Sequence, residues 1–308
     1  MTALPSLATS ASPLRGTLSV DVEDYFHVEA FANIVARADW PSYPSRVVDN
    51  TRRLLDLLDE IGVTATFFII GWVAERFPAL VREILDRRHE VGCHSYWHQL
   101  ISTLSREDFA QDTRRAKDVI EQAGGVPVWG YRAPSFSITA ETSWAFDVLS
   151  QCGFRYDSSV FPVRHDIYGI PDAPRQPFRV QTPSGVLFEY PLTTFRYRRG
   201  PNVPVAGGGY LRLLPFWLTR AGVRRAAGEG VSIVTYVHPW EFDPDQPRLP
   251  ASWRSRFRHY TNLGTTADRL RRLCGIVSYA PFRDSDPPSG QVVYTSEQFA
   301  IERRAGAR

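Results

Sequence analysis

Residues 64–71 read TATFFIIG, a run of small, β-branched and aromatic residues without a charge. A continuous apolar run of this kind is typical of a strand that is buried on both faces of a parallel sheet. VSIVTYVHP at 231–239 has the same character. GTLSVD at 16–21 and HEVGCH at 89–94 are shorter runs that end in a polar residue, and VPVWGYRAP at 126–134 is a further run with an arginine near its end. These stretches predict the strands of one parallel sheet.

Helical patterns alternate with these strands. The predicted helices lie at 46–60, after Pro78, from Ser105 to about Ala123, from Thr139 to Leu149, at 210–228 and at 265–274. Repeated strand–helix units in one chain predict an α/β fold, and we expect a distorted (β/α) barrel. The segment 161–208 is rich in proline and reads as irregular. We expect a loose tail at 1–13, a catalytic domain at 14–240 and a C-terminal extension at 241–308 that packs on the barrel.

Composition excludes several classes of protein. The chain has 308 residues, a formal net charge of +3 and three widely spaced cysteines, so neither a disulfide framework nor a cysteine metal site is indicated. There is no apolar run of membrane-spanning length, and residues 1–13 do not read as a signal peptide. No nucleic-acid-binding signature accompanies the late arginines, which an anionic glycan or a membrane surface explains equally well. We expect a cytoplasmic protein, peripheral to the inner membrane at most.

Two polar clusters follow predicted strands. His94 and His98 in HSYWH are spaced i, i+4, and on a helical turn they would point the same way and bind one cation. Asp21, Glu23 and Asp24 in DVED end the first strand, where burial of three acids is costly without a metal or an arginine. Together they predict a site with two histidines, one carboxylate and open coordination positions, which suits zinc hydrolysis or non-haem iron chemistry.

Three further residues carry chemistry. Arg132 in YRAPSF follows a strand and can hold a carboxylate through a bidentate pair. Asp157 in YDSS can orient or charge a histidine, although an N-cap or turn aspartate explains this residue better when it is taken alone. His238 leaves the apolar strand of VTYVHPWE and can act as a general acid near neutral pH. No serine elbow and no paired cysteine nucleophile is present, which disfavours a covalent acyl-enzyme.

In chain order these blocks resemble the five motifs of the polysaccharide deacetylases, carbohydrate esterase family four. The motifs correspond to SVDVEDYF at 19–26, the pair His94 and His98, Arg132 with Pro134, Asp157, and His238. The family's fourth motif also has a tryptophan, which this chain lacks. DVEDYF, GFRYDSSVFP and the tail from Trp253 to Leu263 are most similar to deacetylases encoded with bacterial exosortase-type exopolysaccharide loci.

The resemblance implies an activity. The chain would remove N-acetyl groups from N-acetylhexosamine residues of a bacterial exopolysaccharide or its precursor, in contact with the machinery that makes it. One divalent metal ion, zinc by expectation, would be held by His94, His98 and a carboxylate. Asp21 would be the general base, tethered by Arg132, and His238, assisted by Asp157, would protonate the leaving amine. We expect the glycan to contact three further residues: Pro134, Phe136 and Trp240.

DVED departs from the family's two adjacent aspartates and leaves the metal carboxylate open. Strand alternation places Asp21 and Glu23 on one face and favours Glu23 as the ligand. Alignment of the Glu23–Asp24 pair with the family's aspartates favours Asp24 instead, with Glu23 as the base. Two rival functions also remain: an allantoinase-like hydrolase of a small-molecule amide, and a catalytically inactive glycan-binding protein.

Overall fold

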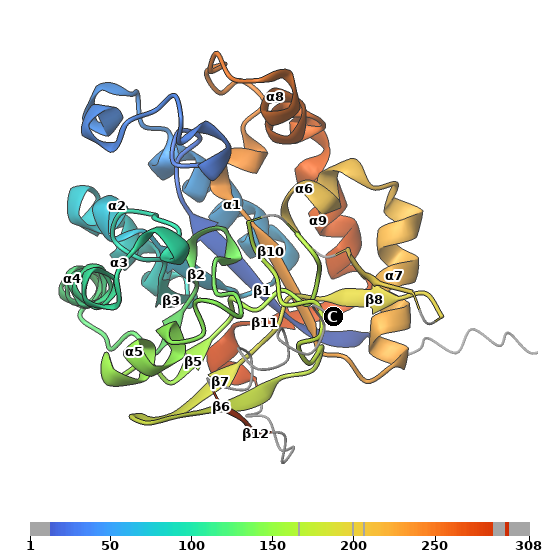
Figure 1. The fold of residues 1–308 in the computed structure, drawn as a ribbon. Helices are drawn as coiled ribbons and strands as arrows, with labels where there is room; N and C mark the ends of the chain where they lie inside the picture. Colours follow the sequence, from blue (N-terminus) through green and yellow to red (C-terminus); the bar gives the residue numbers. More distant parts are fainter. Residues whose placement is uncertain (1–12, 166, 199, 206, 286–292, 296–308) are drawn as a thin grey trace, which may run out of the picture.

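The computed structural model describes residues 13–165, 167–198, 200–205, 207–285 and 293–295 (Figure 1). Its main element is a sheet with the order β10-β1-β2-β3-β4-β5-β7-β6-β12, in which β11 also pairs with β1. A separate hairpin joins β8 to β9. The strands are β1 (Leu14–Val22), β2 (Thr66–Ile69), β3 (Glu90–Cys93), β4 (Gly130–Tyr131), β5 (Tyr156–Asp157), β6 (Phe178–Thr182), β7 (Gly185–Glu189), β8 (Thr194–Arg196), β9 (Asn202–Pro204), β10 (Ile233–Val237), β11 (Val277–Ala280) and β12 (Val293–Thr295).

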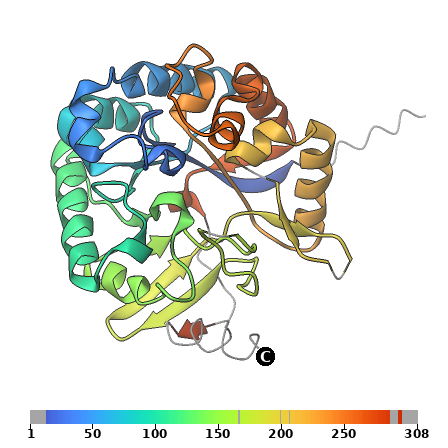
Figure 2. The same ribbon diagram turned by 45° about the horizontal axis from the view of Figure 1, so that its top comes forward.

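Helices form an outer layer around the strands, as Figure 2 shows. They connect strands that run in the same direction, since a parallel pair needs a crossover. The α-helices are α1 (Val47–Ile61), α2 (Gly71–Arg76), α3 (Pro78–Asp86), α4 (Arg106–Gly124), α5 (Ala145–Gln151), α6 (Gly208–Leu213), α7 (Phe216–Gly228), α8 (Trp253–Tyr260) and α9 (Thr266–Cys274). Among the described residues, no helix combines the length and the apolar character that crossing a bilayer requires.

The sheet curves into the distorted barrel that the sequence predicts. Strand β1 lies at its centre, parallel to β10 on one side and to β2 and β11 on the other. Beyond β7 the chain returns to β10, where the Thr193 hydroxyl donates to the Val234 carbonyl (3.0 Å) and accepts from the Val234 N–H (2.6 Å). This contact brings the far side of the sheet back to β10, so the carboxyl ends of the strands surround one rim.

Two predicted segments differ from the structure. The helix expected at 210–228 is two helices, α6 and α7, because Pro215 has no N–H to donate within a continuous helix. The stretch 161–208, read as irregular, contains the β6–β7 hairpin and the short hairpin of β8 and β9. Valines and phenylalanines alternate with polar residues there, but the prolines around them conceal the strand pattern.

The C-terminal part of the chain contributes directly to the barrel. Strand β11 lies beside the first half of β1, where Leu14 pairs with Val277. Helix α8 precedes β11 in the chain and packs against the short helix Glu29–Phe31 in the loop after β1. The tail predicted at 1–13 lies outside the described residues except for Pro13.

Candidate active site

Three side chains from two strand ends meet at the rim. Glu23 follows β1, and His94 and His98 follow β3; their candidate ligand atoms all lie within 4.8 Å of one another. All three residues are buried, with at most 7% of their surface exposed. Among the described residues, this is the cluster of His, Cys, Asp and Glu side chains that is close enough to share a metal ion.

The histidine pair is brought together by a loop and not by the helical turn expected from its spacing. Ser95 and His98 have left-handed backbone conformations, with φ of 59° and 50°. The carboxylate of Asp112 on α4 accepts hydrogen bonds from the backbone N–H groups of Tyr96 (2.8 Å) and Trp97 (3.1 Å). These contacts hold a non-helical backbone that places the two imidazole centroids 5.0 Å apart.

Hydrogen bonds orient the ligand atoms toward one point. His94 Nδ1 lies 2.8 Å from the Arg132 carbonyl, so this nitrogen donates and Nε2 remains for a metal. The Trp240 indole N–H donates to Glu23 Oε1 (3.0 Å). Glu23 Oε2 is buried and has no hydrogen-bond partner among the described residues, although His98 Nε2 lies 3.0 Å away. A carboxylate oxygen and two imidazoles facing one another in this way fit a divalent cation.

The protonation states of His94 and Glu23 suit a metal site, whereas the charge of Glu23 outweighs burial and raises the pKa of His98. Burial lowers the pKa of His94 to about 4, so the imidazole is neutral at pH 7. Burial works against the charge of Glu23, but the charge of His98, whose Nε2 lies 3.0 Å from Oε2, holds the pKa of Glu23 well below its usual range. A metal needs both the neutral imidazole and the ionised carboxylate.

Asp24, the alternative metal carboxylate, does not join the cluster. Its Oδ2 accepts from the Ser45 hydroxyl (2.7 Å) and from the backbone N–H groups of Arg46 (2.8 Å) and Val47 (3.2 Å) at the start of α1. Its Oδ1 accepts from the Tyr25 N–H (3.0 Å). Both oxygens are committed to the backbone, because the first N–H groups of a helix have no partners within the helix. Glu23, the carboxylate that strand alternation favoured, is therefore the one that lies in the cluster.

Asp21 and Arg132 form a buried pair beside the cluster. The Arg132 guanidinium donates from one amino group to Asp21 Oδ1 (2.9 Å) and from its other nitrogens to the Ser158 carbonyl (2.9 Å) and hydroxyl (2.8 Å). Arg132 is fully buried and Asp21 is 2% exposed. The arginine thus fixes one oxygen of Asp21 and leaves Oδ2 facing the rim.

His238 follows β10 and faces both acids. Its Nε2 lies 3.9 Å from Asp21 Oδ2 and 3.6 Å from Glu23 Oε1. Its Nδ1 lies 3.0 Å from Glu241 Oε2. Burial lowers the pKa of His238, but the hydrogen bond and charge of Glu241, with the charges of Glu23 and Asp21, outweigh burial and raise it to about 9. The imidazole carries a proton at pH 7, which a general acid needs.

Asp157 does not contact His238, contrary to the prediction that it assists this histidine. Its carboxylate accepts from the Ser159 hydroxyl (2.6 Å) and N–H (3.2 Å), and it is paired with the carboxyl of Glu189. The Ser159 hydroxyl accepts from the Ala133 N–H (2.8 Å). Asp157 therefore supports the backbone that follows Arg132.

Glu241 makes the contact with His238 that was expected of Asp157. The signal lay in HPWE, in which the acid stands three residues after the histidine and so on the same side of a tight helical turn. In the structure Pro239–Phe242 is such a turn, a 3₁₀ helix. A short turn of this kind cannot be distinguished from a loop by sequence pattern, which is why the acid was missed.

The predicted substrate contacts lie beneath the rim. Pro134 and Phe136 are buried in the turn after β4, where Phe136 packs edge-to-face on Tyr236 with ring centroids 4.8 Å apart. Trp240 is 5% exposed, and its N–H is used by Glu23. The structure brings Trp240 to the cluster as a support for Glu23, while Pro134 and Phe136 pack behind Arg132.

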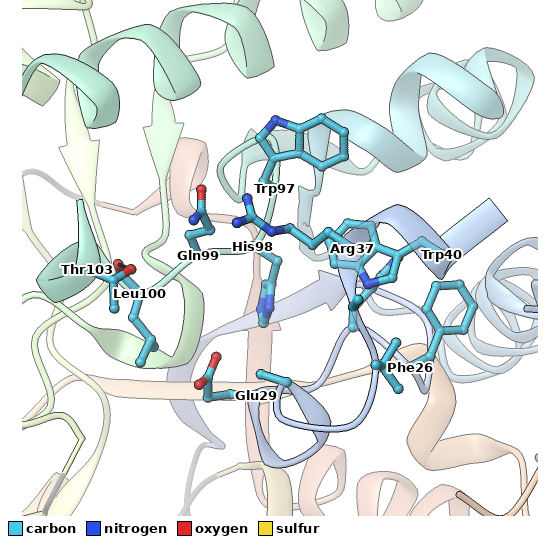
Figure 3. A pocket seen from close by; sticks show the side chains of 13 residues that line it. Phe26, Glu29, Arg37, Trp40, Trp97, His98, Gln99, Leu100 and Thr103 are labelled. Atoms are coloured by element: carbon cyan, nitrogen blue, oxygen red, sulfur yellow. Dashed lines mark hydrogen bonds between the residues drawn. The ribbon is translucent and has the colours of Figure 1, made fainter. Parts of the chain in front are cut away.

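A groove of about 410 Å³ opens beside His98 (Figure 3). The loop after β1 forms one wall, and the loop after His98 forms the other. Figure 3 shows Glu29 on one side of the His98 imidazole and Arg37, Gln99 and Trp97 on the other. Trp97 and Gln99 are partly exposed and Arg37 is exposed. The groove thus offers an aromatic face and polar side chains next to the candidate metal ligands.

Comparison with known proteins places the chain. Residues 39–156 match the polysaccharide deacetylase family model, and residues 158–285 match a domain of unknown function, DUF3473, typical of exosortase-associated deacetylases. A peptidoglycan-N-acetylglucosamine deacetylase of Bacillus cereus is 28% identical over 96 residues, 31% of this chain and 35% of that protein. A chitooligosaccharide deacetylase of Sinorhizobium fredii is 37% identical over 101 residues, 32% of this chain and 44% of that protein.

Each match thus spans less than half the length of the relative. A solved structure described as a polysaccharide deacetylase from Mycobacterium smegmatis is similar over 96% of this chain and 94% of its own, with 20% identity and a TM-score of 0.56. This likeness concerns the fold. With the matched family model and the strand-end cluster, it leads to one conclusion: residues 39–156 match the polysaccharide deacetylase family, and the whole chain has the fold of such a deacetylase.

Proposed function

We propose that this protein is a metal-dependent hydrolase that removes N-acetyl groups from N-acetylhexosamine residues of a bacterial exopolysaccharide or its precursor. The observation that carries the proposal is the meeting of Glu23, His94 and His98 within 4.8 Å, next to Asp21 and His238. These five side chains supply a metal site, a base and an acid at one rim. A deacetylase needs all three.

Each residue has a role in amide hydrolysis, which adds water across the C–N bond and releases acetate and a free amine. A divalent ion held by Glu23, His94 and His98 would polarise the acetamide carbonyl and lower the pKa of water. Asp21, held on one oxygen by Arg132, accepts the proton of the attacking water with Oδ2. His238 donates a proton from Nε2 to the leaving nitrogen, because Glu241 occupies its Nδ1.

The groove beside His98 supports a sugar substrate. Trp97 offers a ring face on which the apolar side of a pyranose can pack, and Glu29, Arg37 and Gln99 offer hydrogen bonds to hydroxyl groups. Residues from two loops, within 26–40 and 97–103, line the groove, and its volume of about 410 Å³ can accommodate a sugar unit.

The test of the activity uses the purified chain with N-acetylglucosamine oligomers and with N-acetylated exopolysaccharide. We expect acetate release that EDTA abolishes and added zinc restores, with about one metal ion bound per chain. His98→Ala is expected to lose metal binding and acetate release together. Thr103→Ala, a groove substitution that leaves the cluster intact, should retain metal binding.

Other outcomes would contradict the proposal. Turnover of a cyclic ureide without acetate release would indicate a small-molecule amidohydrolase. Glycan binding without turnover, in protein loaded with metal, would indicate a binding protein.

The groove makes a separate prediction. Trp97→Ala should raise KM for N-acetylglucosamine oligomers by roughly 10-fold, because loss of one aromatic contact costs about 1 to 1.5 kcal/mol, and should change kcat little. Steady-state kinetics on oligomers of increasing length measure this effect. An equal KM in wild type and variant at every length would exclude Trp97 from the glycan site.

A further inference from the structure

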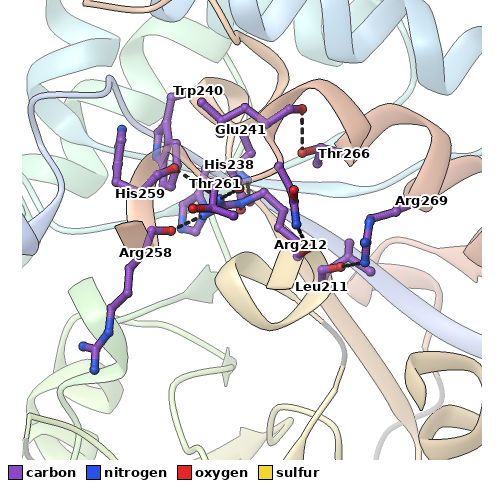
Figure 4. Close-up of polar contacts among 12 residues, drawn as sticks. Leu211, Arg212, His238, Trp240, Glu241, Arg258, His259, Thr261, Thr266 and Arg269 are labelled. Carbon is purple, nitrogen blue, oxygen red and sulfur yellow. Dashed lines mark hydrogen bonds and ion pairs between the residues drawn. The ribbon is translucent and has the colours of Figure 1, made fainter. Parts of the chain in front are cut away.

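The histidine that faces the candidate base is held by a series of buried and partly buried contacts (Figure 4). Glu241 Oε2 accepts from the His238 backbone N–H (2.9 Å) and lies 3.0 Å from Nδ1. One carboxylate oxygen thus contacts both the backbone N–H and the imidazole ring of His238. The contact fixes the ring orientation and directs Nε2 toward Asp21 and Glu23.

Arg212 on α6 holds the other oxygen of this carboxylate. Its Nε donates to Glu241 Oε1 (2.6 Å), and both side chains are about 1% exposed. Burial raises the pKa of Glu241, but the charge of Arg212 and the hydrogen bond of His238 outweigh burial and lower it to about 2. Glu241 is therefore an anion that cannot turn away from His238 without leaving Arg212.

Arg212 is in turn held by the end of α8. Its two amino groups donate to three backbone carbonyls, those of Arg258 (3.0 Å), His259 (3.1 Å) and Thr261 (2.6 Å). The last carbonyls of a helix have no partner within the helix, so the guanidinium serves as their cap. The Asn262 side chain returns a hydrogen bond to the Arg212 carbonyl (2.9 Å).

A second contact joins the same segment to the cluster. The His259 ring stacks on Trp240 with centroids 4.1 Å apart, and the Trp240 N–H donates to Glu23. The opposite side of the Trp240 ring system is approached by His238, with centroids 5.0 Å apart. The turn at residues 258–262 thus reaches the candidate acid through Arg212 and the candidate metal ligand through Trp240.

We propose that Glu241 and Arg212 are positioning residues for the proton donor His238, and that the 258–262 turn fixes them. The inference rests on the proposed deacetylase function. It assigns the C-terminal segment a part in catalysis. The contacts that orient His238 Nε2 toward the rim run through Glu241 and Arg212 to backbone carbonyls of that segment.

The principal test is Glu241→Gln, which keeps the side-chain shape and removes the charge. We expect kcat for acetate release to fall on the order of 100-fold, with KM and zinc affinity changed less than about threefold. A merely structural role would move KM and zinc affinity as well. Wild-type kcat in Glu241→Gln would overturn the inference and leave the proposed function intact, whereas absence of acetate release from the wild-type enzyme would overturn both.

Arg212→Lys and Arg269→Lys form a matched pair. Arg269 also caps a helix, donating to the carbonyls of Leu211 (2.8 Å) and Leu214 (2.6 Å), but it makes no hydrogen bond to Glu241. We expect Arg212→Lys to lower kcat about tenfold, because lysine cannot hold Glu241 and three carbonyls together, while Arg269→Lys retains the wild-type kcat. Equal kcat values in the two variants would contradict the inference.

Asn262→Gly tests the turn without a buried substitution. Asn262 is exposed and has a φ of 60°, which glycine adopts freely, so the variant loses the bond to Arg212 and keeps the backbone. A fall in kcat of about two- to fivefold at constant KM supports the role of the turn, consistent with the loss of one hydrogen bond. An unchanged kcat overturns it.

Discussion

Two pairs of buried side chains, each built around a carboxylate, behave in opposite ways. Glu241 is paired with Arg212 at the end of β10, and its pKa is about 2. Asp157 is paired with Glu189 at the ends of β5 and β7, and burial raises the pKa of both carboxyls, that of Glu189 well above its ordinary value. Charge is therefore favoured on the first carboxylate and disfavoured on the second pair.

The difference lies in the neighbouring donors and not in the depth of burial, since all three acids are 0% exposed. Arg212 compensates the charge of Glu241, whereas Asp157 and Glu189 receive hydrogen bonds mainly from Ser159 and Val160. A buried anion can hold an imidazolium in place, whereas the Asp157–Glu189 pair, on which burial disfavours charge, binds neutral donors. The comparison indicates that a neighbouring guanidinium determines which buried acid is ionised and can therefore hold the proposed proton donor.

The largest expected effect follows from removing the arginine. Arg212→Met removes the guanidinium that compensates the buried charge of Glu241, leaves only His238 beside it, and should lower the free energy of unfolding by about 3–5 kcal/mol. Denaturant unfolding measures the loss, and Arg52→Met, which removes the largely exposed pair with Glu83, should lose much less. If both variants were equally stable, Glu241 would not be a buried anion, and the contrast between the two regions would fail.

A smaller effect concerns the pH dependence of stability. The folded chain keeps a proton on the Asp157–Glu189 pair above the ordinary glutamate pKa of 4.5, while the unfolded chain releases it. The pair's contribution is therefore fully present below that pH and is lost as pH rises, by up to about 1.4 kcal/mol per pH unit.

Glu189→Gln removes this titration and keeps an acceptor for the N–H groups of Ser159 and Val160. Unfolding free energies at pH 5, 6, 7 and 8 should fall less steeply in the variant than in wild type. Parallel curves would show that the pair is ionised in the folded protein.

The smallest expected effect is on turnover. Asp157→Asn should change kcat for acetate release by less than about threefold, because Asp157 makes no contact with His238 and acts only through Ser159 and the backbone after Arg132. Steady-state kinetics beside Glu241→Gln would sharpen the comparison. A loss in Asp157→Asn as large as that in Glu241→Gln would restore Asp157 as the partner of His238.

The sequence by itself determined the barrel and the ends of its strands. Apolar runs such as 64–71 and 231–239 are stable only when they are buried in the sheet. Polar residues that follow such strands then lie at the carboxyl rim of the barrel. Strand alternation also selected Glu23 over Asp24 as the carboxylate that faces the histidines, because successive side chains point to opposite faces.

The tertiary structure alone decided which partners these side chains have. The loop that turns His98 toward His94 depends on Asp112, and the anion that holds His238 depends on Arg212 and the 258–262 turn. These contacts join residues far apart in the chain. Such pairings arise from the packing of whole elements, and local periodicity carries no information about them.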